Sequence, residues 1–157
     1  MRRSGPLSGN VQVPGAKNSV LKLMAATLLA EGEYVLTNVP AIADVDTMSD
    51  LLSALGIVTK RLGPHELSLT NSGNISTEAP FENVDRIRAS INVLGPLVAR
   101  VGQADVALPG GDAIGSRGLD FHIKGLESLG AKAHIEHGYV IAEAPNGLIG
   151  APVELDF

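Results

Sequence analysis

Helix-like and strand-like segments follow one another in the same order twice along the chain. Each copy starts with a long apolar stretch, at 20–30 and at 91–100, followed by a glycine, a strand pattern and a helix pattern. The two helix patterns close on matching glycines, Gly56 and Gly130. Repeated units bury their apolar faces against neighbouring copies, so the copies must pack together. The sequence therefore predicts an α/β protein made of two similar units.

A polar segment at 71–83 separates the two copies and is expected to be a linker. We expect a first unit over residues 1–75 and a second over 76–150, both parts of one incomplete domain. Residues 151–157 resemble the opening strand of a third unit that does not follow. One apolar helix face would then lack its neighbour, which predicts self-association of the isolated chain.

Within the first copy, alternation at Val11 and Val13 predicts a short strand. A helix is expected over 19–31, with Asn18 or Ser19 as its cap. The next helix is expected to be capped by Asp44 or Asp46. In the second copy we expect one helix over 84–101, kinked by Pro96, and another over 119–129.

The second copy is longer than the first, and its extra residues fall between Pro109 and Asp120. They read GGDAIGSR at 110–117, a glycine-flanked loop that carries Asp112 and Arg117. A repeat that folds without such a loop does not need it for packing, and added loops on a rigid scaffold are where function concentrates. This loop is the first candidate for chemistry.

Composition excludes several classes of function. The chain has 157 residues, no cysteine and a net charge of −5. Without cysteine there is no disulfide and no thiolate nucleophile, which is compatible with the cytoplasm. The acidic balance argues against a nucleic-acid partner, although an anionic small ligand could still bind where a few basic groups converge.

The sequence gives no expectation of a membrane segment, a metal site or a cofactor. The longest apolar run, at 20–30, is interrupted by Lys22 and is too short to span a bilayer. Residues 1–9 contain no apolar segment long enough for a signal peptide. His134 and His137 are the closest pair of histidines, and on a strand they would face opposite sides.

Four stretches resemble one known family. They are GAKNSVLKLMAATLLAEG at 15–32, RASINVLGPLVAR at 88–100, LPGGDAIGSR at 108–117 and LDFHIKGLESLGA at 119–131. In this order and spacing they resemble the amino-terminal part of the UDP-N-acetylglucosamine 1-carboxyvinyltransferases, which are enolpyruvyl transferases.

The resemblance implies an inside-out α/β barrel domain of βαβαββ units with helices packed inside, truncated here after two units. It implies an enzyme that transfers the enolpyruvyl group of phosphoenolpyruvate to the 3-hydroxyl of UDP-N-acetylglucosamine and releases phosphate. That reaction is the first committed step of peptidoglycan synthesis, on which cell shape and division depend. The missing carboxy-terminal part of the enzyme would be a partner, and the isolated chain is expected to be inactive.

The resemblance also assigns residues to phosphoenolpyruvate. Lys17 and Asn18 would bind it and Lys17 would serve catalysis, with Arg117 brought close to the same ligand. An anion with a phosphate and a carboxylate needs fixed cations, since its unpaired burial is costly. From spacing alone, Lys17 could equally be an exposed turn lysine beside an Asn cap.

Other matching positions would bind the nucleotide sugar. They are Arg88, Asn92, Arg117, Gly118, Leu119, Asp120, Phe121 and His122. Asn92 stands where relatives often have Trp, and Gly118 where they often have Pro. Asp120 could serve only as a helix cap, or as both cap and ligand contact.

Asp112 is the expected proton donor, at a position where many relatives carry Cys. A carboxyl group can deliver a proton at neutral pH if burial or nearby phosphate raises its pKa. The alternative is an ordinary turn residue after two glycines.

Two other functions remain open at this stage. One is a truncated, non-catalytic paralogue that binds a UDP-sugar or a partner chain. The other is the shikimate-pathway enolpyruvyl transferase, which shares the fold but lacks the GGDAIGSR loop.

Overall fold

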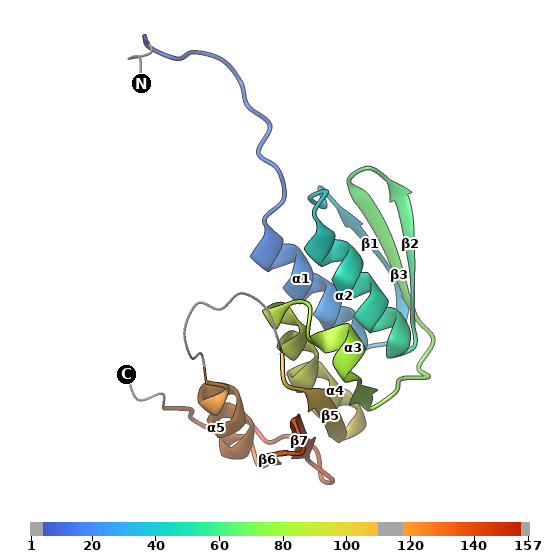
Figure 1. The fold of residues 1–157 in the computed structure, drawn as a ribbon, viewed down its shortest axis with the longest axis vertical. Helices are drawn as coiled ribbons and strands as arrows, with labels where there is room; N and C mark the ends of the chain where they lie inside the picture. Colours follow the sequence, from blue (N-terminus) through green and yellow to red (C-terminus); the bar gives the residue numbers. More distant parts are fainter. Residues whose placement is uncertain (1–4, 110–117, 155–157) are drawn as a thin grey trace.

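The computed structural model describes residues 5–109 and 118–154, and its first half forms a three-stranded antiparallel sheet with two helices on one face (Figure 1). The sheet has the order β1-β3-β2, and Tyr34 of β1 and Thr59 of β2 both pair with Leu69 of β3. The elements in chain order are α1 (Lys17–Ala26), η1 (Thr27–Leu29), β1 (Gly32–Thr37), α2 (Ala43–Ala54), β2 (Ile57–Gly63) and β3 (Glu66–Asn71).

The second half forms a four-stranded sheet of order β4-β5-β7-β6, in which β4 and β5 run parallel and the other pairs antiparallel. Its elements are β4 (Glu78–Ala79), α3 (Phe81–Val84), η2 (Arg88–Val93), α4 (Leu94–Val101), β5 (Gln103–Ala107), α5 (Asp120–Ser128), β6 (Lys132–Glu136) and β7 (Tyr139–Glu143). Within the described residues, no helix is both long and apolar enough to traverse a lipid bilayer.

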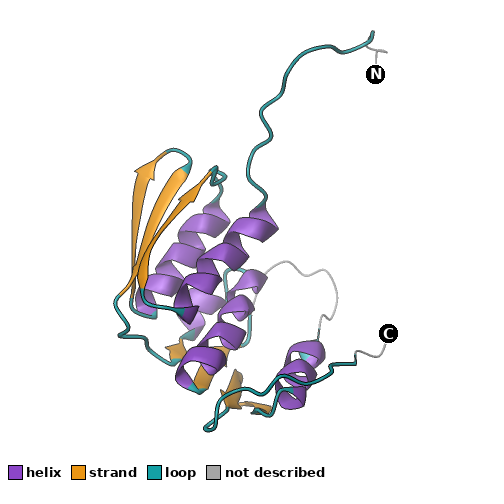
Figure 2. Ribbon diagram, turned by 180° about the vertical axis from the view of Figure 1, so that it is seen from behind, coloured by secondary structure: helices purple, strands orange, loops and turns teal. Residues whose placement is uncertain are grey.

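The two halves share one apolar core, because helices of each half contact helices of the other. Helix α1 packs against η2, and α4 packs against η1 as well as β5. Leu21 and Met24 of α1 and Leu97 of α4 are completely buried in this core. Figure 2 shows α1, α2 and α4 close together, with the first sheet on the outer side of α1 and α2, while α5 lies at the edge of the molecule. Tight packing of this kind fixes the relative positions of α1 and η2, two of the segments that the candidate site requires.

The strand expected around Val11 and Val13 is wrong. Residues 11–13 form no strand, and the two valines are 86% and 72% exposed. Instead, the segment leads away from the body of the molecule (Figure 1). Alternation predicts a strand only where a neighbouring strand pairs with it, and none does here among the described residues. Conversely, the expected linker at 71–83 contains the short strand β4, which pairs with β5.

The expected helix caps are also wrong. Helix α1 already begins at Lys17 after an extended Ala16, so Asn18 and Ser19 lie inside its first turn. Helix α2 follows Ile42, and Asp44 lies in its first turn without capping it. Acidic side chains there still interact favourably with the helix dipole. Cap propensity therefore located both helix starts only to within a few residues.

The single helix expected over 84–101 is divided into α3, η2 and α4. Pro96 does not kink a helix; it lies in the first turn of α4, where its missing N–H group costs no hydrogen bond. The buried Ser90 stabilises the preceding turn, since its hydroxyl donates to the carbonyls of Val84 at 3.0 Å and Ile87 at 2.6 Å. These bonds fix the backbone that carries Arg88.

Candidate functional site

A cavity of about 370 Å³ lies where α1, η2 and α5 meet. It brings together four residues that the sequence assigned to substrate binding, Asn18, Arg88, Asn92 and His122, from three separate segments of the chain. The other lining residues are Leu21, Lys22, Ala89 and Ile91. Within the part of the chain that the structure describes, the polar lining residues are amides, cations and an imidazole, with no carboxylate among them, which suits an anionic ligand.

Lys17 lies next to this cavity but is not among its lining residues. Its ammonium group makes an ion pair with the carboxylate of Asp44 in the first turn of α2. The Lys17 side chain is 56% exposed, whereas that of Asp44 is 22% exposed. Lys17 is also the first residue of α1, where free backbone N–H groups and the helix dipole favour an anion.

Arg88 connects η2 to the start of α5. Its Nη2 donates to the carbonyl oxygen of Gly118 at 3.4 Å. Its positive charge also affects His122: partial burial, and after it the Arg88 charge, lower the pKa of His122 below its ordinary value of 6.5. A neutral imidazole at this place can donate one hydrogen bond and accept another.

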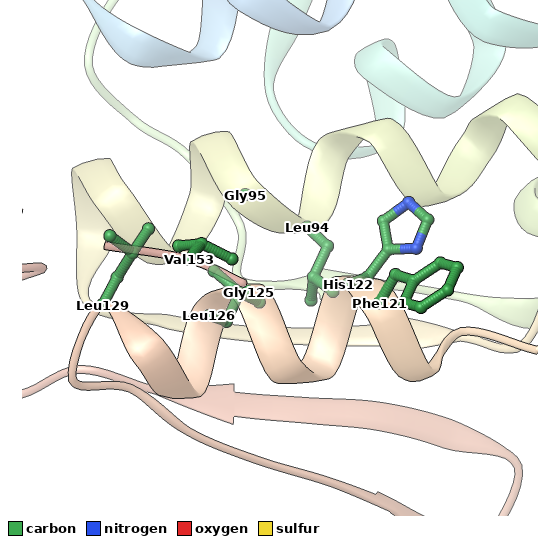
Figure 3. A pocket seen from close by; sticks show the side chains of 8 residues that line it. All are labelled: Leu94, Gly95, Phe121, His122, Gly125, Leu126, Leu129 and Val153. Carbon is green, nitrogen blue, oxygen red and sulfur yellow. The ribbon is translucent and has the colours of Figure 1, made fainter. Parts of the chain in front are cut away.

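Residues 118–122 lie just before and within the first turn of α5, where the sequence predicts the start of a helix. Leu119 precedes the helix and is buried, whereas Asp120 is the first helical residue and makes no capping hydrogen bond. The role of Asp120 as a cap is therefore wrong. Phe121 is 49% exposed, and in Figure 3 its ring lies beside that of His122 at one end of α5. Asp112 and Arg117 lie outside the described residues.

Two residues at the site were not assigned from the sequence. Asp44 was expected only as a cap, and nothing in its surroundings in the sequence connects it with Lys17. Lys22 did give a signal, because it is the one charge that interrupts the apolar run at 20–30. In the structure it lines the cavity.

The whole chain, residues 1–157, matches the family model of EPSP synthase (3-phosphoshikimate 1-carboxyvinyltransferase). The chain belongs to this family. Within the EPSP synthase family, proteins named UDP-N-acetylglucosamine 1-carboxyvinyltransferase are similar to it: the one from Gluconobacter oxydans is 55% identical over 152 residues, and the one from Acidiphilium cryptum 49% over 157. These matches cover 96% and 100% of this chain but only 36% and 37% of those proteins. The resemblance carried by the four motifs is thereby confirmed.

Solved structures show the same fold. The enolpyruvyl transferase NikO from Streptomyces tendae matches with a TM-score of 0.72 and 24% identity, over 88% of this chain and 30% of its own. The EPSP synthase from Acinetobacter baumannii matches with a TM-score of 0.62 and 18% identity, over 87% of this chain and 32% of its own. The expected enolpyruvyl-transferase fold class is confirmed for this member of the EPSP synthase family.

Proposed function

We propose that this chain forms part of an enzyme that transfers the enolpyruvyl group of phosphoenolpyruvate to the 3-hydroxyl of UDP-N-acetylglucosamine. The observation that carries the proposal is the cavity that gathers Asn18, Arg88, Asn92 and His122 from α1, η2 and α5. Relatives that are 49% and 55% identical are named for this activity, whereas the shikimate-type structure is 18% identical. The nucleotide sugar is therefore favoured over a shikimate as acceptor.

The reaction needs an acid, a base and a clamp for the phosphate. The 3-hydroxyl group gives up its proton to the base as its oxygen bonds to C2 of phosphoenolpyruvate, and the acid adds a proton to the methylene carbon of phosphoenolpyruvate, so that the carbon–carbon double bond is lost. The phosphate then leaves C2 as a proton is removed from the methylene carbon, which restores the double bond. Asp112 is proposed as the group that delivers the proton, which a carboxyl group can do when its pKa is raised.

The cations have separate tasks in this scheme. Lys17, at the start of α1, and Arg117 hold phosphoenolpyruvate, because a charge-assisted contact to phosphate is about twice as strong as a neutral hydrogen bond. Arg88 and Asn92 of η2, with residues 117–122, hold the nucleotide sugar. Arg88 lines the cavity and also donates a hydrogen bond to the carbonyl of Gly118. It therefore holds the backbone just before α5 in place.

We place this reaction in the cytoplasm, at the committed step of peptidoglycan synthesis that the relatives' name implies. The remaining part of a longer protein is its proposed partner, because this chain spans only 36% and 37% of the relatives it matches. Reacting groups in such an enzyme act together only when both sides of the site close around the substrates.

Phosphate release by the protein expressed from its full reading frame tests the proposal. We expect release with phosphoenolpyruvate and UDP-N-acetylglucosamine, and none when shikimate 3-phosphate replaces the nucleotide sugar. Lys17→Ala should reduce turnover at least about tenfold, the effect of one lost charged contact of roughly 1.5–3 kcal/mol. Nucleotide-sugar binding without phosphate release would support the non-catalytic paralogue instead.

A further inference from the structure

Lys22 belongs to the face of α1 that lines the cavity. Leu21 and Lys22 follow Asn18 by three and four residues, which places all three on one side of the helix. All three line the cavity. No ion pair or hydrogen bond reaches the Lys22 ammonium from the residues that the structure describes. The side chain is exposed and lines the cavity, and no carboxylate is among the described residues of that lining.

Lys22 is exposed to water, as lysines usually are, and it also lines the cavity. Helix α1 leaves the apolar Leu23 52% exposed, while the neighbouring charged residue lines the cavity. The placement therefore points to a ligand on the cavity side of the helix.

The chemistry of the lining identifies the class of ligand. Lys22 and Arg88 supply two cations to a single cavity, and the amide of Asn92 supplies a further donor. His122 adds no charge at neutral pH, because burial and Arg88 lower its pKa. Two cations with several donors match a group with two adjacent negative charges, such as a diphosphate.

We propose that Lys22, together with Arg88, binds the diphosphate of the nucleotide substrate. The proposal rests on the proposed function, because it deepens the nucleotide-sugar site described there. Phosphoenolpyruvate is the other substrate that carries a phosphate group and could occupy such a site. Lys17 and Asn18 are assigned to it. Asn18 lines the cavity, whereas Lys17 lies outside the lining and is paired with Asp44.

Calorimetric titration tests the proposal on the protein expressed from its full reading frame. The probes are uridine, UDP, UDP-N-acetylglucosamine and phosphoenolpyruvate, each with wild type, Lys22→Met and the control Lys60→Met on the exposed side of β2. We expect Lys22→Met to weaken UDP and UDP-N-acetylglucosamine about tenfold or more, as loss of a charged contact does, and to leave uridine unchanged. Lys22→Arg should keep most of the affinity.

Salt provides a second measurement. Affinity for UDP should fall less steeply with added salt in Lys22→Met than in Lys60→Met, because one cation fewer is screened. Equal thermal unfolding midpoints for the two variants will show that the fold is intact, and Lys22→Gln replaces Lys22→Met if they differ.

Each other result overturns a distinct statement. Wild-type protein that binds no UDP-N-acetylglucosamine overturns the proposed function and the role of Lys22 with it. Normal UDP binding by Lys22→Met overturns only the role of Lys22. Loss of phosphoenolpyruvate binding with unchanged UDP binding assigns Lys22 to the other substrate and also refutes the diphosphate contact.

Discussion

The ion pair with Asp44 holds the side chain of Lys17, the residue that we propose to bind phosphoenolpyruvate. A free lysine side chain loses up to about 2 kcal/mol of rotamer entropy when it is fixed, so a carboxylate that already orients it lowers the cost of binding. We expect Asp44→Asn to raise the KM for phosphoenolpyruvate several-fold and to leave the KM for UDP-N-acetylglucosamine unchanged.

A merely structural role of Asp44 is distinguishable. Partly exposed pairs contribute about 0–1 kcal/mol to stability, so the unfolding midpoint of Asp44→Asn should move little. Asp44→Glu should restore the KM for phosphoenolpyruvate. A lower KM in Asp44→Asn would mean that Asp44 competes with the substrate for Lys17 rather than orienting it.

Asp112 gives a residue-scale prediction about inhibition. A thiolate attacks an epoxide readily, whereas a carboxylate is a much weaker nucleophile. The wild-type enzyme should therefore resist covalent labelling by the epoxide fosfomycin, and Asp112→Cys should become sensitive. Asp112→Asn should abolish phosphate release. Mass spectrometry that finds fosfomycin attached to the wild-type protein contradicts the prediction.

The lowered pKa of His122 makes stability depend on pH. The folded protein disfavours the charged imidazole, so folding loses stability when the unfolded chain takes up a proton that the folded chain does not. This contribution is intact above the ordinary value of 6.5 and is lost as the pH falls below it. NMR titration should show His122 protonating below pH 6.5.

The same effect is measurable by mutation. Thermal unfolding midpoints of wild type should fall between pH 7.5 and pH 5.5 more steeply than those of His122→Gln. His137→Gln removes a histidine whose side chain is 88% exposed and serves as the control. An equal fall in wild type and His122→Gln would refute the assignment.

At the scale of elements, the start of α1 depends on a close backbone approach. A Cβ atom at Gly15 would lie 1.9 Å from the carbonyl oxygen of Asn38, so no larger residue fits without a shift. Gly15→Ala should therefore destabilise the fold by about 1–3 kcal/mol, as overpacking does, and displace Lys17 and Asn18. Urea unfolding measures the first effect and phosphoenolpyruvate titration the second.

Gly125→Ala is the matched control for that substitution. Gly125 lies within α5, and apart from its chain neighbours and the backbone of its own helix nothing lies within 4 Å of an added Cβ atom there. Alanine is favoured over glycine inside a helix by about 1 kcal/mol, so this variant should be as stable as wild type or more so. Similar losses in both variants would argue that glycine flexibility, not space at Gly15, determines the result.

The sequence predicts most elements but not how they end or which ones pair. Periodic apolar positions identified α2, since Met48, Leu51, Leu52 and Leu55 are all buried. Pairing is a tertiary property, so the strand at Val11 and Val13 could not be rejected, and the two-residue β4 could not be found. The motifs predicted four residues that line one cavity, Asn18, Arg88, Asn92 and His122, and their roles in binding stay predictions. The Lys17–Asp44 pair was not predictable, because it joins helices that the sequence cannot orient.

At the scale of the whole molecule, an apolar groove of about 270 Å³ lies between α4 and α5 (Figure 3). Its lining includes Leu94, Leu126, Leu129 and Val153. Exposed apolar grooves promote association, so the isolated chain should form oligomers in light scattering. Val153→Asp should reduce them, whereas Val11→Asp, at an 86% exposed loop position, should not.

The isolated chain should also release no phosphate, and a monodisperse, active monomer contradicts this prediction.

The two sheets share an order that differs at one edge. Strands β1, β3 and β2 occupy the places that β5, β7 and β6 occupy in the second sheet, where β4 adds a further parallel strand beside β5. Among the described residues, β1 therefore has hydrogen-bonding groups along one side that no strand uses. Such an edge is a template for another strand. One more strand can pair with this edge of β1, parallel to β1 as β4 is to β5, without separating any strands that are already paired.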